Sequence, residues 1–125
     1  MNNTTIVTGI SILFIITVIT GIVLSIPGRP LNAALFNVHK LIAIGVIILS
    51  VIAFLRLFKA TTSIESPVKL LTIIAVISLI GLVVTGGLLS FDRFAGRLIV
   101  AVHAISTGTA GISLAVLLFR FLRAL

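Results

Sequence analysis

The sequence predicts an all-α membrane protein: a transmembrane four-helix bundle of up-down-up-down topology, made of two repeated helical hairpins. Its 125 residues are 60% hydrophobic, with a mean hydropathy of +1.45, so its few charges cannot cover a soluble surface. Four apolar runs each come close to the roughly twenty residues that cross a hydrocarbon core. In addition, the second half of the chain repeats a pattern of the first half. We therefore treat the chain as one multi-pass transmembrane domain, residues 1–125.

The four helices are expected at residues 5–26, 33–58, 67–89 and 93–123. The first run follows "MNNTT", which lacks the basic region of a signal peptide, so it is retained as a helix. Asn32 is a suitable N-cap for the second helix, and Ser66 with Pro67 suits the start of the third. Asp92 is expected to cap the fourth. The short connections predict antiparallel neighbours, which places the second and fourth helices diagonally across the bundle.

An internal repeat relates the two halves of the chain. The segment "VITGIVLS" at 18–25 aligns with "VVTGGLLS" at 83–90, and after a one-residue deletion "VH" at His39 aligns with "VH" at His103. Apolar residues agree easily by chance in a membrane chain, but the agreement of every histidine and of both TG segments does not arise so easily. The predicted repeat units are residues 1–60 and 66–124.

The two histidines are predicted to lie at one depth. His39 lies about seven residues inside its helix and His103 about six beyond Arg97, which places both roughly 10 Å below the same membrane surface. Gly21 and Gly86 each precede a helix end by four or five residues, at a similar depth. The two histidines and the two glycines therefore form one expected layer.

The residue types in this layer indicate a haem. A zinc or copper site built from protein alone needs three or four ligands, and the only acids, Glu65 and Asp92, are predicted in loops at opposite membrane faces. A haem supplies four nitrogens of its own and needs two axial ligands. The chain has no cysteine for thioether attachment. We therefore expect one haem b per chain, with its iron bound by His39 and His103. The alternative roles for the two histidines are a proton or ion relay and simple hydrogen bonding between helices.

With haem between opposed histidines and glycines on the two flanking helices, the chain resembles the haem-binding core of membrane b-type cytochromes, including the respiratory cytochrome b family. The resemblance implies that His39 and His103 are the axial ligands. It also implies that Gly21 and Gly86 are haem-packing glycines, whose alternative role is the close packing of helices.

The chain departs from the respiratory family at a second site. That family carries another histidine pair about two heptads further along the same helices, where this chain has Ala53 and Leu117. The sequence therefore supports one haem near one membrane face and puts electron transfer across the whole membrane in doubt.

Further candidate residues surround the histidines. Thr20 and Thr85 are expected either to bond back to carbonyls of their own helices or to hold a histidine ring nitrogen. Basic residues on the histidine side are expected either to anchor the helices at the membrane surface or to pair with haem propionates. These basic residues are Arg29, Lys40, Arg93 and Arg97.

The other basic residues favour one membrane orientation. Five lie on the face opposite the histidines, against four on the histidine side, which weakly predicts cytoplasmic termini and a haem toward the outer face. These five are Arg56, Lys59, Lys69, Arg120 and Arg123. The net charge of +7 does not indicate nucleic acid, because the basic residues lie at helix ends and loops without interleaved aromatic residues.

These observations predict a small b-type cytochrome, an electron-transfer protein more than a catalyst in its own right. Its expected partners are the lipid bilayer and a quinone or a soluble redox protein. A homo-oligomer stays open, because one histidine from each of two chains would also ligate a haem. The alternatives are a small transporter or channel with a histidine proton relay, and a structural accessory subunit.

Overall fold

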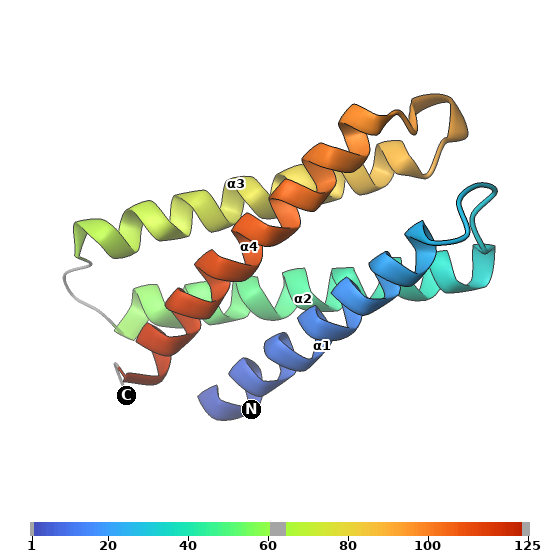
Figure 1. The fold of residues 1–125 in the computed structure, drawn as a ribbon. Coiled ribbons are helices and arrows are strands. Elements are labelled where there is room, and N and C mark those ends of the chain that lie inside the picture. The colour runs from blue at the N-terminus through green and yellow to red at the C-terminus, as the bar shows by residue number, and fades with distance from the viewer. Residues whose placement is uncertain (1, 61–64, 124–125) are drawn as a thin grey trace. The chain divides into compact units, whose positions relative to one another are not determined.

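The computed structural model describes residues 2–60 and 65–123, and its regular structure there is entirely helical. Each of the four α-helices is long and apolar enough to cross a membrane. The predicted fold class is therefore confirmed, as four long apolar helices that fit an all-α four-helix bundle. The elements in Figure 1 are α1 (Asn3–Ser25), α2 (Ala33–Ala60), α3 (Ser66–Leu89), the short 3₁₀ helix η1 (Asp92–Phe94) and α4 (Arg97–Arg123).

The chain divides into two compact units. One is the hairpin of α1 and α2, and the other is the hairpin of α3 and α4 (Figure 1). Within each hairpin the connection is short, so the two helices run antiparallel along each other.

Asparagine side chains cap both helices of the first hairpin. Asn2 precedes α1, and its side-chain oxygen accepts from the Thr5 backbone N–H at 2.7 Å. Asn32 precedes α2 and accepts from the Leu35 backbone N–H at 3.0 Å, which confirms the predicted cap. In the turn between the helices, Gly28 has a φ of +75°, a conformation that glycine adopts without steric cost.

Glycines let α1 and α2 approach closely. A Cβ atom at Gly9 of α1 would lie 3.1 Å from Leu49 Cδ1 of α2, and a Cβ atom at Gly45 of α2 would lie 3.2 Å from Leu13 Cδ1 of α1. Each leucine therefore fills the space above a glycine of the facing helix. Small residues at helix contacts of this kind favour association in lipid, where no hydrophobic effect drives the helices together.

The third helix begins one residue earlier than predicted. Glu65 is the N-cap residue and Ser66 is already helical, so the prediction of Ser66 as N-cap is wrong. Pro67 is compatible with either start, because the fixed φ of proline suits the first turn of a helix and its missing N–H is not needed there. The backbone N–H groups of Val68 and Lys69 bond to the Glu65 carbonyl at 3.0 and 3.2 Å.

The fourth helix begins later than predicted. The expected start at 93 with Asp92 as cap is wrong, because residues 92–94 form η1 and α4 starts at Arg97. The backbone closes this turn locally, with the Phe94 N–H bonded to the Phe91 carbonyl at 3.0 Å. Gly96 then supplies the first carbonyl of the helix, which accepts from Val100 N–H at 3.2 Å.

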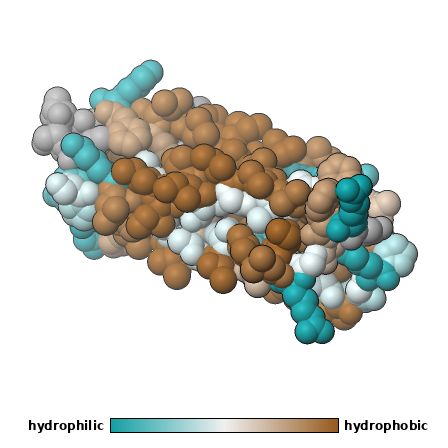
Figure 2. Space-filling view, turned by 90° about the horizontal axis from the view of Figure 1, so that it is seen from above, coloured by the Kyte–Doolittle hydropathy of each residue, from teal (hydrophilic) through white to brown (hydrophobic). Residues whose placement is uncertain are grey.

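The surface of the helices has the distribution expected of membrane spans. Figure 2 shows hydrophobic side chains along the lengths of the helices and hydrophilic side chains gathered at their ends. At the ends opposite the histidines, Arg56 donates to the Asn3 side-chain oxygen at 3.1 Å in the first hairpin. In the second hairpin, Arg120 pairs with Glu65 at 3.4 Å, and both side chains are exposed. An exposed pair of this kind contributes about 0–1 kcal/mol, so it marks a helix end more than it stabilises one.

Candidate cofactor-ligating histidines

In the first hairpin, a threonine of α1 holds the histidine of α2. His39 lies six residues after Ala33, the first residue of α2, and its ring is half-buried. Its Nδ1 atom lies 3.0 Å from Thr20 Oγ1. The ring is therefore oriented by the neighbouring helix.

The second hairpin repeats this arrangement. His103 lies six residues after Arg97, the first residue of α4, and is also half-buried. Its Nδ1 atom lies 2.7 Å from Oγ1 of Thr85, a buried residue of α3. Each hairpin thus brings together one threonine and one histidine that the sequence analysis had singled out, at equal distances from the helix start.

The threonine hydroxyls also bond to their own helices. Thr20 Oγ1 lies 2.8 Å from the Ile16 carbonyl oxygen and 3.0 Å from that of Thr17. Thr85 Oγ1 lies 2.6 Å from the Gly81 carbonyl oxygen. The two roles expected for these threonines as alternatives are therefore filled together.

These contacts suit a ring that carries its proton on Nδ1. A threonine hydroxyl has one hydrogen, and a carbonyl oxygen can only accept. Each hydroxyl lies 2.6–2.8 Å from a carbonyl oxygen, to which it can donate while its own oxygen accepts from Nδ1–H. A neutral imidazole protonated at Nδ1 keeps its lone pair at Nε2, the atom through which it can bind a metal.

The glycines next to these threonines make room for the rings. A Cβ atom at Gly21 would lie 3.2 Å from His39 Cε1, and a Cβ atom at Gly86 would lie 3.5 Å from His103 Cε1. The sequence predicted haem packing or helix packing at these positions. In the structure each glycine contacts a histidine ring, because the space left by the missing side chain lies against the edge of the imidazole. In both hairpins a Thr-Gly pair therefore faces one histidine.

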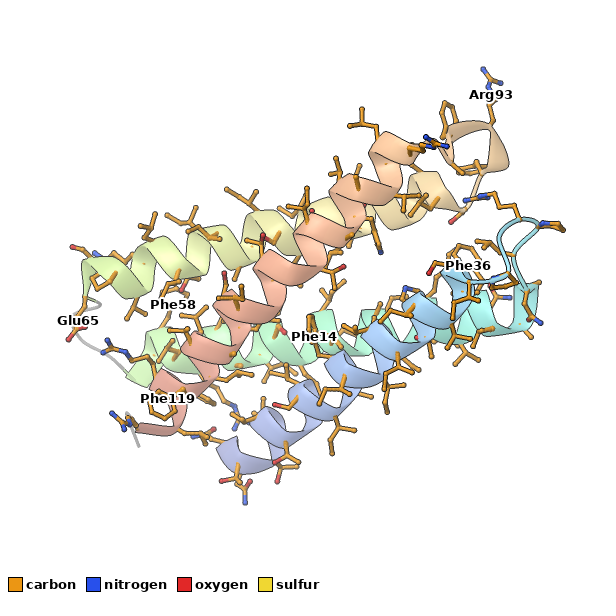
Figure 3. The ribbon with its side chains drawn as sticks, viewed as in Figure 1. Phe14, Phe36, Phe58, Glu65, Arg93 and Phe119 are labelled. Atoms are coloured by element: carbon orange, nitrogen blue, oxygen red, sulfur yellow. The ribbon has the colours of Figure 1, made fainter. Side chains whose placement is uncertain are left out.

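The basic residues of the histidine side lie near helix starts and in the connecting turns. Lys40 directly follows His39, and its Nζ atom lies 4.3 Å from the centre of the Phe36 ring. Arg93 lies 5.5 Å from the Phe94 ring centre, and Figure 3 shows it projecting away from the connection between α3 and α4. The remaining two are Arg29, in the turn between α1 and α2, and Arg97, the first residue of α4.

Each hairpin contains one histidine. Over residues 2–60 and 65–123, no three or more His, Cys, Asp or Glu side chains gather into a group that could hold a metal ion. No protein-family model, curated protein or solved structure matches the chain. The case for function therefore depends on the threonine, glycine and histidine of each hairpin.

Alanine at each glycine tests the close approach of the rings. Alanine is the better helix former by about 1 kcal/mol, and 3.5 Å is an ordinary contact, so we expect Gly86→Ala to raise the free energy of unfolding slightly. At Gly21 the 3.2 Å contact forces the ring to move, at a cost of about 1–3 kcal/mol that cancels or exceeds this gain. Unfolding in mixed micelles, followed by circular dichroism, measures both changes. Equal stabilisation by the two variants would contradict the crowding at Gly21.

Proposed function

We propose that this chain is a membrane protein that binds one haem b, with Nε2 of His39 and Nε2 of His103 as the two axial ligands, and that it transfers single electrons near one membrane face. The observation that carries the proposal is the repeated threonine–histidine contact. Each hairpin holds its histidine at Nδ1, six residues from the start of its helix. An imidazole that carries its proton on Nδ1 binds a metal through Nε2.

The donor set fits a haem better than any other metal group. A haem requires two axial ligands from the protein, and neutral imidazoles whose other nitrogen is hydrogen-bonded are suitable ones. A zinc or copper site would require at least one further ligand, and no third donor accompanies either histidine among the described residues. Haem b, when bound, supplies one-electron exchange at its iron. With both axial positions filled, electron transfer is favoured over catalysis at the metal.

The apolar helices and the basic residues near their starts suit the same role. Long apolar helices exclude water from the ligands, and low polarity around a haem favours its less charged, reduced form. The basic residues near the helix starts are suited to pair with the carboxylates of the propionates. These basic residues are Arg29, Lys40, Arg93 and Arg97.

The single-haem form of the membrane b-type cytochromes is the class that this proposal implies. Ala53 and Leu117, which stand where the respiratory cytochrome b family has its second histidine pair, are buried apolar residues, 2% and 1% exposed. They offer no donor for a second haem. Electrons would then pass between a quinol or a soluble redox protein and an acceptor on the same side of the bilayer.

A histidine proton relay is less well supported. The threonine hydroxyl that contacts each ring also contacts a backbone carbonyl of its own helix. A carbonyl accepts a hydrogen bond but has no proton to pass on. A path through the threonines therefore ends inside the helix, as suits the positioning of a ligand more than proton transport.

Replacing each histidine tests the ligand assignment. We expect His39→Ala and His103→Ala to insert into the membrane, and each to lose haem or to retain it in a high-spin state with one protein ligand. Titration of haem into the purified apoprotein, followed by absorption and electron paramagnetic resonance spectra, measures this. Asn37→Ala, an exposed polar position on the same helix as His39, is the matched control and should bind haem like the wild type. Unchanged low-spin binding in both histidine variants would sink the assignment.

The proposed orientation has the termini in the cytoplasm and the haem toward the outer face. The chain lacks cysteine, so single cysteines report sidedness directly. We expect a membrane-impermeant maleimide to label Ile26→Cys and Phe91→Cys in intact spheroplasts, because both positions are exposed in the turns near the histidines. Lys59→Cys should react only after permeabilisation. The reverse pattern would invert the orientation, and labelling of all three from one side would contradict four crossings.

A further inference from the structure

In each hairpin, one continuous line of hydrogen bonds joins the imidazole to the backbone of the neighbouring helix. The distances are 3.0 Å from His39 Nδ1 to Thr20 Oγ1 and 2.8 Å onward to the Ile16 carbonyl. Both distances are shorter in the second hairpin: 2.7 Å from His103 Nδ1 to Thr85 Oγ1, and 2.6 Å from Thr85 Oγ1 to the Gly81 carbonyl. All four distances lie within the usual range for such bonds.

Threonine hydroxyls in these helices commonly bond to a carbonyl of their own helix, and Thr20 and Thr85 contact a histidine ring as well. Other threonine hydroxyls on the described helices bond back to a carbonyl four residues earlier at 2.8–2.9 Å without contacting a histidine ring. These are Thr17, Thr72, Thr107 and Thr109. Thr20 and Thr85 differ from these threonines because each hydroxyl also contacts a histidine ring. Each of the two is followed by a glycine that lets the ring approach.

The polarity of the line affects the ring electronically. A hydroxyl that donates to a carbonyl becomes a better acceptor, because successive hydrogen bonds polarise one another. A ring that donates from Nδ1–H to such an acceptor holds more electron density, and its Nε2 atom becomes a stronger donor to a metal. A stronger donor favours the ferric over the ferrous state of iron, and so lowers the reduction potential.

We propose that Thr20 and Thr85 are positioning residues: each accepts a hydrogen bond from Nδ1–H of one histidine, fixes that ring with Nε2 as its metal-binding atom, and lowers the reduction potential of the bound haem. This inference depends on the proposed function, because it requires that the two histidines ligate a haem. It assigns to each Thr-Gly pair a division of roles. The threonine orients and polarises the ring, and the glycine leaves space for its Cε1 edge.

Valine and serine at the two positions test the inference on the haem-loaded protein. Valine keeps the shape of threonine without the hydroxyl, whereas serine keeps the hydroxyl. We expect Thr20→Val and Thr85→Val each to raise the midpoint potential, by about a tenfold change in the relative affinity for the two oxidation states, or about 59 mV. Thr20→Ser and Thr85→Ser should remain near the wild-type value. Thr72→Val, on the same helix as Thr85, is the matched control and should leave the potential unchanged.

The outcomes separate this inference from the proposed function. Wild-type potentials in both valine variants would overturn the inference and leave the cytochrome assignment in place. A wild-type protein that binds no haem would overturn both. Loss of haem from the valine variants, with retention in the serine variants, would support the positioning role.

A measurement on the wild-type chain tests the inference even if the variants fail to fold. Nuclear magnetic resonance of the apoprotein labelled with ¹⁵N-histidine distinguishes the two tautomers of each ring. We expect both rings to carry their proton on Nδ1. A proton on Nε2 of either ring would contradict the inference without the use of any variant.

Discussion

The contact between a histidine Nδ1 atom and a threonine hydroxyl on the neighbouring helix is the interaction on which the candidate site depends. An ionisable side chain inside the hydrocarbon core is costly, and a polar ring atom there without a partner adds to the cost. Thr20 and Thr85 lower that cost, because each places a hydroxyl within hydrogen-bond distance of one ring. Each hydroxyl also lies within hydrogen-bond distance of a carbonyl of its own helix.

Close approach of the helices makes this bond possible. A threonine side chain is short, so its hydroxyl reaches the facing ring only where the backbones come near each other. In the first hairpin Gly9 and Gly45 lie against leucines of the facing helix, and Gly21 lies against the ring itself. In the second hairpin a Cβ atom at Gly81 would lie 3.1 Å from Ser106 Oγ. These four glycines therefore have a structural use that is independent of any cofactor.

Hydropathy and turn chemistry predicted the elements well, because long apolar runs and capping residues are local features of the chain. The four helices and the cap at Asn32 follow from such features. The two errors at helix starts are local as well. Ser66 and Asp92 both suit an N-cap, but Pro67 is accepted in the first helical turn, and η1 replaces the first turn expected of α4.

The internal details of the site lay beyond sequence reasoning. The repeat singled out Thr20 and Thr85, yet no periodicity tells whether a hydroxyl donates to a carbonyl or to a ring. That choice depends on distances of a few tenths of an ångström between two helices. The contact of Gly21 with a ring edge is of the same kind. The spacing of TG segments and histidines predicted which residues belong together, whereas the distances between their atoms required coordinates.

The central proposal is that the two histidines, each in contact with one threonine, ligate one haem. The most direct test is the visible absorption spectrum of the wild-type protein, purified in mild detergent and compared before and after reduction with dithionite, with a pyridine haemochrome assay for stoichiometry. The account predicts a sharp Soret band, separate α and β bands on reduction, and about one haem b per chain. A colourless protein that stays colourless when haem is added would contradict it.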